Sequence, residues 1–119
     1  MHNEVPLFQN IYDFYKLFYL YIDHFPKKSR EVLSQKIESN ILGLLELISK
    51  AGFSGQNEKI YSLTAASIKL DFLKVLFRLT FDLKIIDQKK YILLEEKLQE
   101  MGRMLGGWIK SIKSKNPDF

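Results

Sequence analysis

The most constraining feature of the chain is a run of apolar residues in its last third that recur every three or four positions. Its members are Tyr91, Leu94, Leu98, Met101, Leu105, Trp108 and Ile112. A mean period of 3.5 residues places all seven on one side of an α-helix, whereas a β-strand would show strict alternation. No stretch of the sequence alternates in that way. The pattern therefore predicts an all-α fold with a long amphipathic helix over residues 88–113.

Three further segments show the same helical period and are separated by proline or glycine. They span residues 7–24, 29–51 and 57–85, and a frayed tail is expected at 114–119. The expected seams of the first two are Leu7, Ile11, Phe14, Phe18, Tyr21 and Phe25, and Leu33, Ile37, Ile41, Leu44 and Ile48. Long helices joined by short links pack as antiparallel neighbours. The sequence thus predicts a single domain, residues 1–119, folded as an up-down-up-down four-helix bundle.

Residues with strong preferences for helix ends define the three links. Pro26 should end the first helix, because the residue before a proline is pushed out of the helical conformation. Gly52 is expected to stop the second helix in a left-handed conformation. The side chains of Ser29, Asn57 and Asp87 can cap the starts of the second, third and fourth helices.

The helix at 57–85 carries more apolar surface than one bundle requires. One arc holds Leu63, Leu70, Leu73, Phe77 and Phe81, and an arc roughly opposite holds Ile68, Phe72, Val75, Leu76, Leu79, Leu83 and Ile86. Because a surface helix needs only one apolar face, the second arc predicts a partner subunit, with Phe72, Leu76 and Leu79 as anchors. The alternative is a central helix that its own bundle buries on both sides.

Positive charge is concentrated in a few segments of a chain whose net charge is +4. Clustered cations favour a phosphate-rich or acidic partner. In the second half of the third helix, the candidate phosphate contacts are Lys74, Arg78 and Lys84. Alternatively, Lys74 and Arg78 pair with Asp71 and Asp82 on the same helix, which would leave this strip nearly neutral.

The last helix contains a glycine-rich stretch, residues 102–111. Its glycines are Gly102, Gly106 and Gly107. Each interior glycine costs a helix about 1 kcal/mol relative to alanine, so we expect these three to permit close approach of another backbone or a ligand. After Glu100 this helix carries three cations: Arg103, Lys110 and Lys113. Since no carboxylate occurs between Glu100 and Asp118, we expect the three cations to lack local partners and to form a phosphate-facing stripe.

Little in the sequence supports catalysis. The only histidines are His2 and His24, and no nucleophile elbow, phosphate-binding loop or Glu-x-x-His spacing occurs. We expect no enzymatic activity, no cofactor, no metal and no small-molecule substrate. The chain has no cysteine and no long uncharged apolar run, so we expect a soluble cytoplasmic protein without a membrane segment. The aromatic residues at 8–25 are expected to fill a core or an interface rather than to stack on bases.

Several motifs resemble a known family. The run Gly-Arg-Met-Leu at 102–105, followed by Ile-Lys-Ser at 109–111, is similar to two branches of four-helix-bundle proteins. One is the accessory variability determinant of diversity-generating retroelements, and the other is encoded in intervening sequences of bacterial large ribosomal RNA genes. The retroelement branch is favoured by matches at 25–26, 37–38, 44–47, 73–74, 78–79, 82–84 and 106–108. There are two departures from the family pattern. Lys74 stands where arginine is common, and Phe81 stands where a basic residue is expected, which lowers the charge of that helix.

The resemblance implies a ring-like homopentamer of four-helix bundles with a basic surface. It implies a non-catalytic subunit that binds RNA, or DNA, together with the reverse transcriptase of the element. The implied role is to support error-prone copying of a template RNA into a variable gene. Two alternatives stay open: a ribosome- or RNA-associated bundle of the related branch, and a protein–protein adaptor whose basic surface meets acidic proteins.

Overall fold

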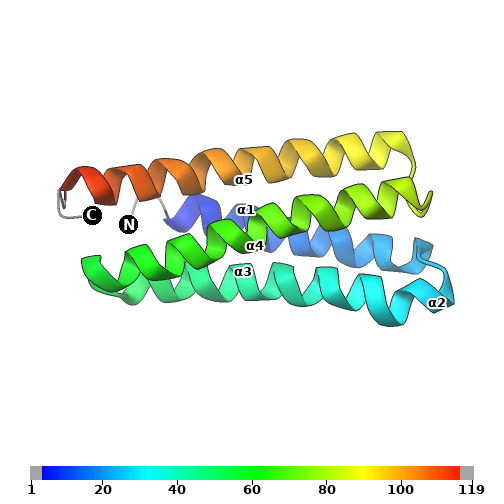
Figure 1. Cartoon of the computed structure of the whole chain (residues 1–119), viewed down its shortest axis with the longest axis horizontal. Helices are drawn as coiled ribbons and strands as arrows, with labels where there is room; N and C mark the ends of the chain where they lie inside the picture. The colour runs from blue at the N-terminus through cyan, green and yellow to red at the C-terminus, as the bar shows by residue number, and fades with distance from the viewer. Residues whose placement is uncertain (1–3, 116–119) are drawn as a thin grey trace.

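Four rods lie side by side in the computed structural model, which describes residues 4–115 and their side chains from Pro6 onward (Figure 1). The elements in chain order are α1 (Glu4–Tyr21), the 3-10 turn η1 (Ile22–His24), α2 (Lys27–Ser29), the π-helical turn η2 (Arg30–Ser34), α3 (Gln35–Phe53), α4 (Gln56–Asp82) and α5 (Gln88–Lys115). Because α2, η2 and α3 follow one another without a break, they form one rod. The four helices expected from the sequence are confirmed.

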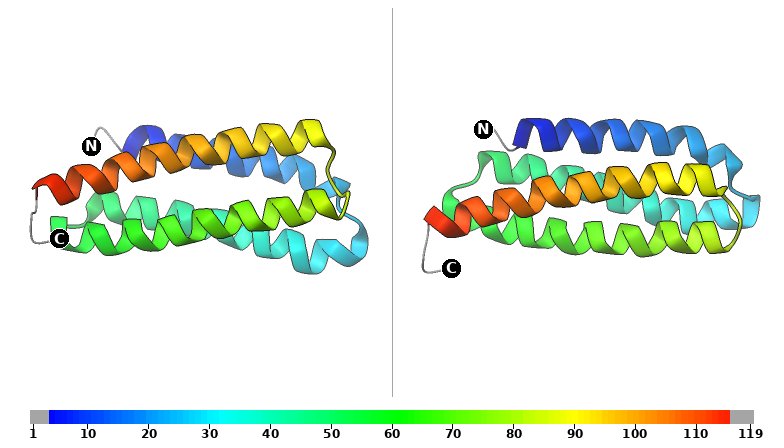
Figure 2. Two further views of the ribbon diagram at one scale, coloured as in Figure 1. Left: turned by 45° about the horizontal axis from the view of Figure 1, so that its top comes forward. Right: turned by 90° about the horizontal axis from the view of Figure 1, so that it is seen from above.

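The rods run alternately up and down around the bundle. α3 packs against α1 and α4, α4 packs against α5, and α5 closes the bundle against α1. Figure 2 shows this arrangement from two further sides, with the α3–α4 link at one end and the other two links at the opposite end. The expected antiparallel arrangement is confirmed, and the bundle measures 47 × 23 × 21 Å.

The core consists of one apolar seam from each rod. The seam residues expected in the first, second and fourth helices are buried, except Tyr21 and Tyr91, which are half-buried. α4 contributes Leu63, Leu70, Leu73 and Phe77. The ring of Phe77 meets the rings of Phe14 and Phe18 edge to face, with centroids 5.7 and 5.8 Å apart. Such pairs add about 0.5–1.5 kcal/mol to the burial of the rings, so they fix α1 against α4.

The link between α1 and α2 begins where the sequence predicts. Phe25 is extended and precedes Pro26, which ends η1. The next helix already begins at Lys27, because Pro26 itself takes the position before the first helical residue. The cap expected at Ser29 is therefore wrong, and Ser29 makes no capping hydrogen bond. Instead, the guanidinium of Arg30 closes the link by donating to the carbonyl of Phe25 at 3.1 Å.

The second link differs from the expected one at both ends. Gly52 does not stop α3, and no glycine in the described part of the chain has a positive φ. Ser54 ends the helix, with its hydroxyl donating to a carbonyl one turn back at 2.8 Å. The expected Asn57 cap is also wrong, because α4 begins directly after Gly55. The backbone N–H of Gly55 donates to the carboxylate of Glu58 at 3.2 Å, which is the half of a capping box that a glycine can form.

The third link ends α4 at Asp82, three residues earlier than expected. Lys84 adopts a left-handed conformation with φ of 62°. Its backbone N–H donates to the carbonyl of Phe81 at 2.9 Å, and that of Ile85 donates to the carbonyl of Thr80 at 3.1 Å. These two bonds are the pair that defines a Schellman motif. The apolar spacing could not reveal this end because it continues beyond it.

Asp87 caps α5 as expected. Its carboxylate accepts the backbone N–H of Lys90 at 2.8 Å. This hydrogen bond is the main cause that holds the pKa of Asp87 below its usual value, and the amine of Lys90 lies 3.5 Å from the same carboxylate. α5 extends to Lys115, so the first two residues of the expected frayed tail are helical. Residues 116–119 lie outside the described part.

Candidate nucleic-acid and subunit interfaces

Three cations, here called the α5 stripe, lie on the outer side of α5. They are Arg103, Lys110 and Lys113, and all three are exposed. Trp108 and Ile112 alternate with them in sequence and are buried, so the bundle fixes the stripe on the side facing solvent. At a rise of about 1.5 Å per residue, the stripe extends roughly 15 Å along the helix. The exposure expected for these three side chains agrees with the structure.

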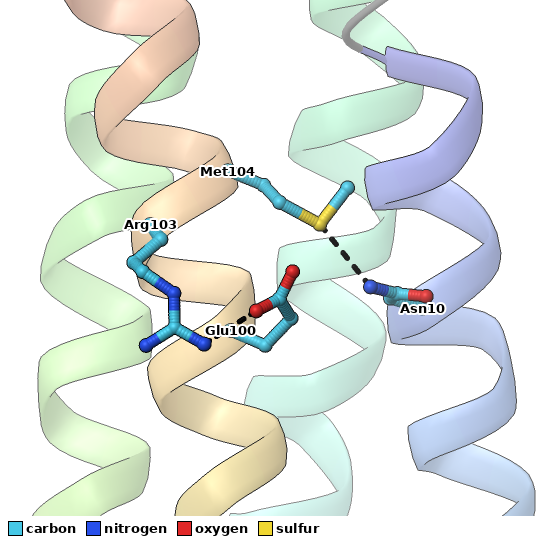
Figure 3. A network of polar contacts seen from close by, with 4 residues as sticks. All are labelled: Asn10, Glu100, Arg103 and Met104. Atoms are coloured by element: carbon cyan, nitrogen blue, oxygen red, sulfur yellow. Dashed lines mark hydrogen bonds and ion pairs between the residues drawn. The ribbon is translucent and has the colours of Figure 1, made fainter.

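Arg103 has a local partner that the sequence argument missed. Its guanidinium forms an ion pair with the carboxylate of Glu100, one turn earlier on α5 (Figure 3). The expectation that no carboxylate meets the stripe is therefore wrong at Arg103, because residues three apart on a helix face each other. Both side chains are exposed, so the pair contributes little to stability. Within residues 6–115, no carboxylate lies within 4.0 Å of the amine of Lys110 or Lys113.

The three glycines of α5 have different surroundings. A Cβ at Gly102 would lie 3.7 Å from the side chain of Leu70 and 3.8 Å from the amine of Lys74, which are ordinary contact distances. A Cβ at Gly106 or Gly107 would meet no other described atom within 4 Å. Packing inside the protomer therefore does not explain these two glycines, although each costs the helix about 1 kcal/mol. That they admit another molecule stays a prediction.

An open groove of about 350 Å³ lies between α4 and α5. It brings together four residues singled out separately in the sequence: Lys74 from α4, and Gly102, Arg103 and Gly106 from α5. Its other lining residues are Ser67, Leu70, Asp71, Gln99 and Leu105. The amine, guanidinium, hydroxyl and amide groups can all donate to phosphate oxygens. Asp71 is the one carboxylate among the described residues that line the groove.

Gly106→Ala tests whether the groove needs a glycine at this position. The substitution should raise the free energy of unfolding by up to about 1 kcal/mol, because the new methyl group meets no described atom within 4 Å. If another molecule packs on Gly106, the variant should bind RNA or assemble less well in spite of its greater stability. Urea denaturation measures the first effect, and fluorescence anisotropy with light scattering measures the second. A less stable variant would contradict the open surroundings of Gly106.

The other predicted cations lie outside this groove. Burial raises the pKa of Tyr91 on α5, and the positive charge of Arg78 opposes that rise. Within the described part of the chain, neither Lys74 nor Arg78 has a carboxylate within 4.0 Å, so the alternative pairs with the neighbouring aspartates are not formed. Lys84 lies in the α4–α5 link, at the end of the bundle remote from Lys110. The six predicted cations thus do not form one continuous surface.

One face of α4, here called the α4 face, leaves apolar side chains exposed. Its members are Tyr61, Ile68, Phe72, Val75 and Leu79, together with Leu83 directly after the last helical residue. Phe72 is 40% exposed and Leu79 is 44% exposed, so both predicted anchors are accessible to a partner. Leu76 is only 6% exposed, because it lies at the edge of its arc nearest the core. Its prediction as an interface residue is wrong, and so is the alternative in which α4 is buried on both sides.

The aromatic residues of α1 divide between the core and the surface. Phe14 and Phe18 are buried, whereas Tyr12 and Tyr19 are exposed. Leu42 of α3 is also exposed, and it follows by one helical turn the residue Glu38, which accepts a hydrogen bond from Tyr15 of α1. Tyr12, Tyr19 and Leu42 are here called the α1–α3 face. The expectation that all these aromatics fill a core or an interface does not separate the two groups. Spacing could have separated them, because Tyr12 and Tyr19 lie seven residues apart and outside the seam.

Tyr15, which lies between Tyr12 and Tyr19 in the sequence, connects α1 to α3. The hydroxyl of Tyr15 donates to the carboxylate of Glu38 at 2.8 Å, and this hydrogen bond is the main cause that raises the pKa of Tyr15. Beside it, the amine of Lys16 lies 5.6 Å from the centre of the Tyr12 ring. In the described part of the chain, no three His, Asp or Glu side chains lie close enough together to hold a metal ion. None of its helices is long and apolar enough to cross a membrane.

The fold and these surfaces define a class of protein. It is a four-helix bundle with a cationic stripe on α5 and an exposed apolar face on α4. A family model described as bAvd-like matches residues 6–112, most of the chain. The chain therefore belongs to the bAvd-like family, the bacterial accessory variability determinants of diversity-generating retroelements. Neither a curated protein nor a solved structure matches it. Membership implies an accessory role in a retroelement, generally non-catalytic and associated with the reverse transcriptase.

Proposed function

We propose that the protein binds RNA, and DNA of similar shape, as a subunit of a retroelement reverse transcriptase complex. In this role it supports mutagenic copying of the template RNA. The observation that carries the proposal is the exposed α5 stripe beside Gly106 and Gly107, two glycines without a packing role in the protomer. Lysine and arginine side chains on a helix contact phosphates and carry no information about base sequence. We therefore expect binding that depends on charge and shape rather than on sequence.

We propose further that the protein assembles through its α4 face into a homo-oligomer. Covering Phe72 and Leu79 would remove apolar surface from water. This burial favours association by about 25 cal/mol of free energy per Å². A closed ring requires two unlike faces on each protomer, and the α1–α3 face supplies an apolar surface unlike the α4 face. The number of five subunits comes from the family resemblance. In a pentamer the α5 stripe would be repeated five times, which multiplies the phosphate contacts.

The salt dependence of RNA binding tests the proposal. Fluorescence anisotropy should give a log Kd that rises linearly with log salt, with a slope of about 2.7 for each subunit that contacts the RNA, since each phosphate contact contributes roughly 0.9 and one subunit offers three cations. Two unrelated structured RNAs should bind with similar affinity. A weak slope would favour a protein–protein adaptor, and no binding at low salt would refute the proposal. Copurification with ribosomes in place of the reverse transcriptase would favour the ribosomal branch.

A further inference from the structure

An open cleft of about 710 Å³ lies at the end of the bundle where η1, the α4–α5 link and the start of α5 meet. Its volume falls within the range of roughly 300–1,000 Å³ typical of small-molecule sites. The cleft is separate from the α5 stripe. Arg103 follows the start of α5 by some four helical turns, which is a distance of about 22 Å along the helix.

One wall of the cleft is apolar. It is formed by Phe81, Ile85 and Ile86. The ring of Phe81 stacks on the ring of Tyr91, with centroids 4.6 Å apart and planes 9° apart. Ile86 is buried and packs in the core. An apolar wall that includes an aromatic ring suits a planar base, because every base has a face that can pack against it.

Lys84 lines the cleft from a strained backbone position. Its φ of 62° lies in the left-handed region, where glycine is the usual residue of a Schellman motif. Glycine would form the same two backbone hydrogen bonds without strain. Lysine in place of glycine here costs stability. Because strained positions cluster at functional sites, this cost indicates a role for the side chain of Lys84.

The polar groups of the cleft include both signs of charge. His24, Lys84 and Lys90 provide donors, and Asp82 and Asp87 provide carboxylates. Asp87 is occupied, because it accepts the N–H of Lys90 at 2.8 Å and pairs with its amine at 3.5 Å. Asp82 forms no ion pair within residues 6–115. The cleft therefore presents Lys84 and His24 to an anion and Asp82 to hydroxyl donors.

We propose that this cleft binds a single nucleotide unit. Lys84 and His24 would hold its phosphate, Asp82 would accept from the ribose hydroxyls, and the base would lie against Phe81 and Ile85. A nucleotide combines an anion, hydroxyl donors and a flat ring, which are the three chemistries that the cleft accommodates. A free nucleotide and the terminal nucleotide of an RNA strand share this chemistry, and the second source rests on the proposed RNA-binding function.

Titration with adenosine 5′-monophosphate, followed by NMR of isoleucine methyl groups, tests the proposal. The methyl signals of Ile85 and Ile86 should shift in a saturable way, while that of Ile41, in the middle of α3, should not. Lys84→Gly should weaken this binding about tenfold, the effect of losing one charge-assisted hydrogen bond. The same variant should unfold at a higher urea concentration, because glycine relieves the backbone strain. Lys89→Gln is the control, since it removes an equal charge nearby but outside the cleft.

Unchanged affinity in Lys84→Gly, an equal loss in Lys89→Gln, or the same shifts with inorganic phosphate alone would each overturn the proposal. Lys84→Asn repeats the test with a residue that tolerates the left-handed conformation. The two sources are separated by comparing a 5′-phosphorylated linear RNA with a circular RNA of the same sequence. Tighter binding of the linear form at Ile85 and Ile86 identifies the terminal nucleotide. RNA binding without these shifts would exclude the terminal nucleotide as the source. Because the α5 stripe is remote, the absence of shifts with adenosine 5′-monophosphate as well would refute the cleft and leave the proposed function standing.

Discussion

Simultaneous replacement of Arg103, Lys110 and Lys113 by glutamate should weaken RNA binding about 100-fold or more near 0.1 M salt, and it should flatten the salt slope. Each replacement removes a counterion-releasing contact and adds repulsion from the phosphates. Folding should be nearly unaffected, because exposed charges contribute little to stability. Most of the loss should appear in the Lys110→Glu, Lys113→Glu double variant, since Arg103 is already paired with Glu100. Fluorescence anisotropy across salt concentrations measures the effect.

The matched control replaces Lys27, Lys28 and Lys36 by glutamate. It changes the net charge of the chain by the same amount at a different place. A similar loss in both variants would show that binding follows the overall charge and not the α5 stripe. If the stripe variant binds RNA as well as the parent, the stripe is solvated surface. Lys74, in the α4–α5 groove, and Arg78 would then be the next cations to test.

The α4 face gives the second large effect. Phe72→Asp combined with Leu79→Asp should convert the assembly into protomers of 14.0 kDa. A carboxylate buried without a partner opposes association strongly. Each protomer should remain folded, because Phe72 and Leu79 are already 40% and 44% exposed within it. Light scattering after gel filtration, with circular dichroism to check the helices, measures both properties.

Ile92→Asp is the control for this experiment, because Ile92 is similarly exposed on α5, outside the α4 face. It should leave the assembly intact. Leu76→Asp should instead unfold the protomer, since Leu76 is buried in its own bundle. A parent protein that is monomeric at micromolar concentration would rule out assembly through the α4 face. Association that persists in the double variant would place the subunit interface elsewhere.

The sequence by itself determined the four helices and the residues that fill their common core. Burial of one side of a helix follows from spacing alone, so the seams of the first, second and fourth helices were predictable residue by residue. Pro26 and Asp87 fixed two ends, because their effects depend only on adjacent backbone. The motif at 102–111 indicated the family, and the family match over residues 6–112 agrees with it. Local chemistry was sufficient for all of these.

Only the tertiary structure decided which face of each helix is covered by its neighbours. Spacing placed Leu76 and Leu79 on one arc, but the neighbouring rods cover the first and leave the second exposed. It placed Lys74 and Gly102 in different helices, and the packing of α4 against α5 brings them to opposite sides of one groove. Lys84 could not be assigned to a cleft before the end of α4 was known. The periodicity of a helix gives the direction of each side chain around its own axis, whereas burial and site geometry depend on where the other axes lie.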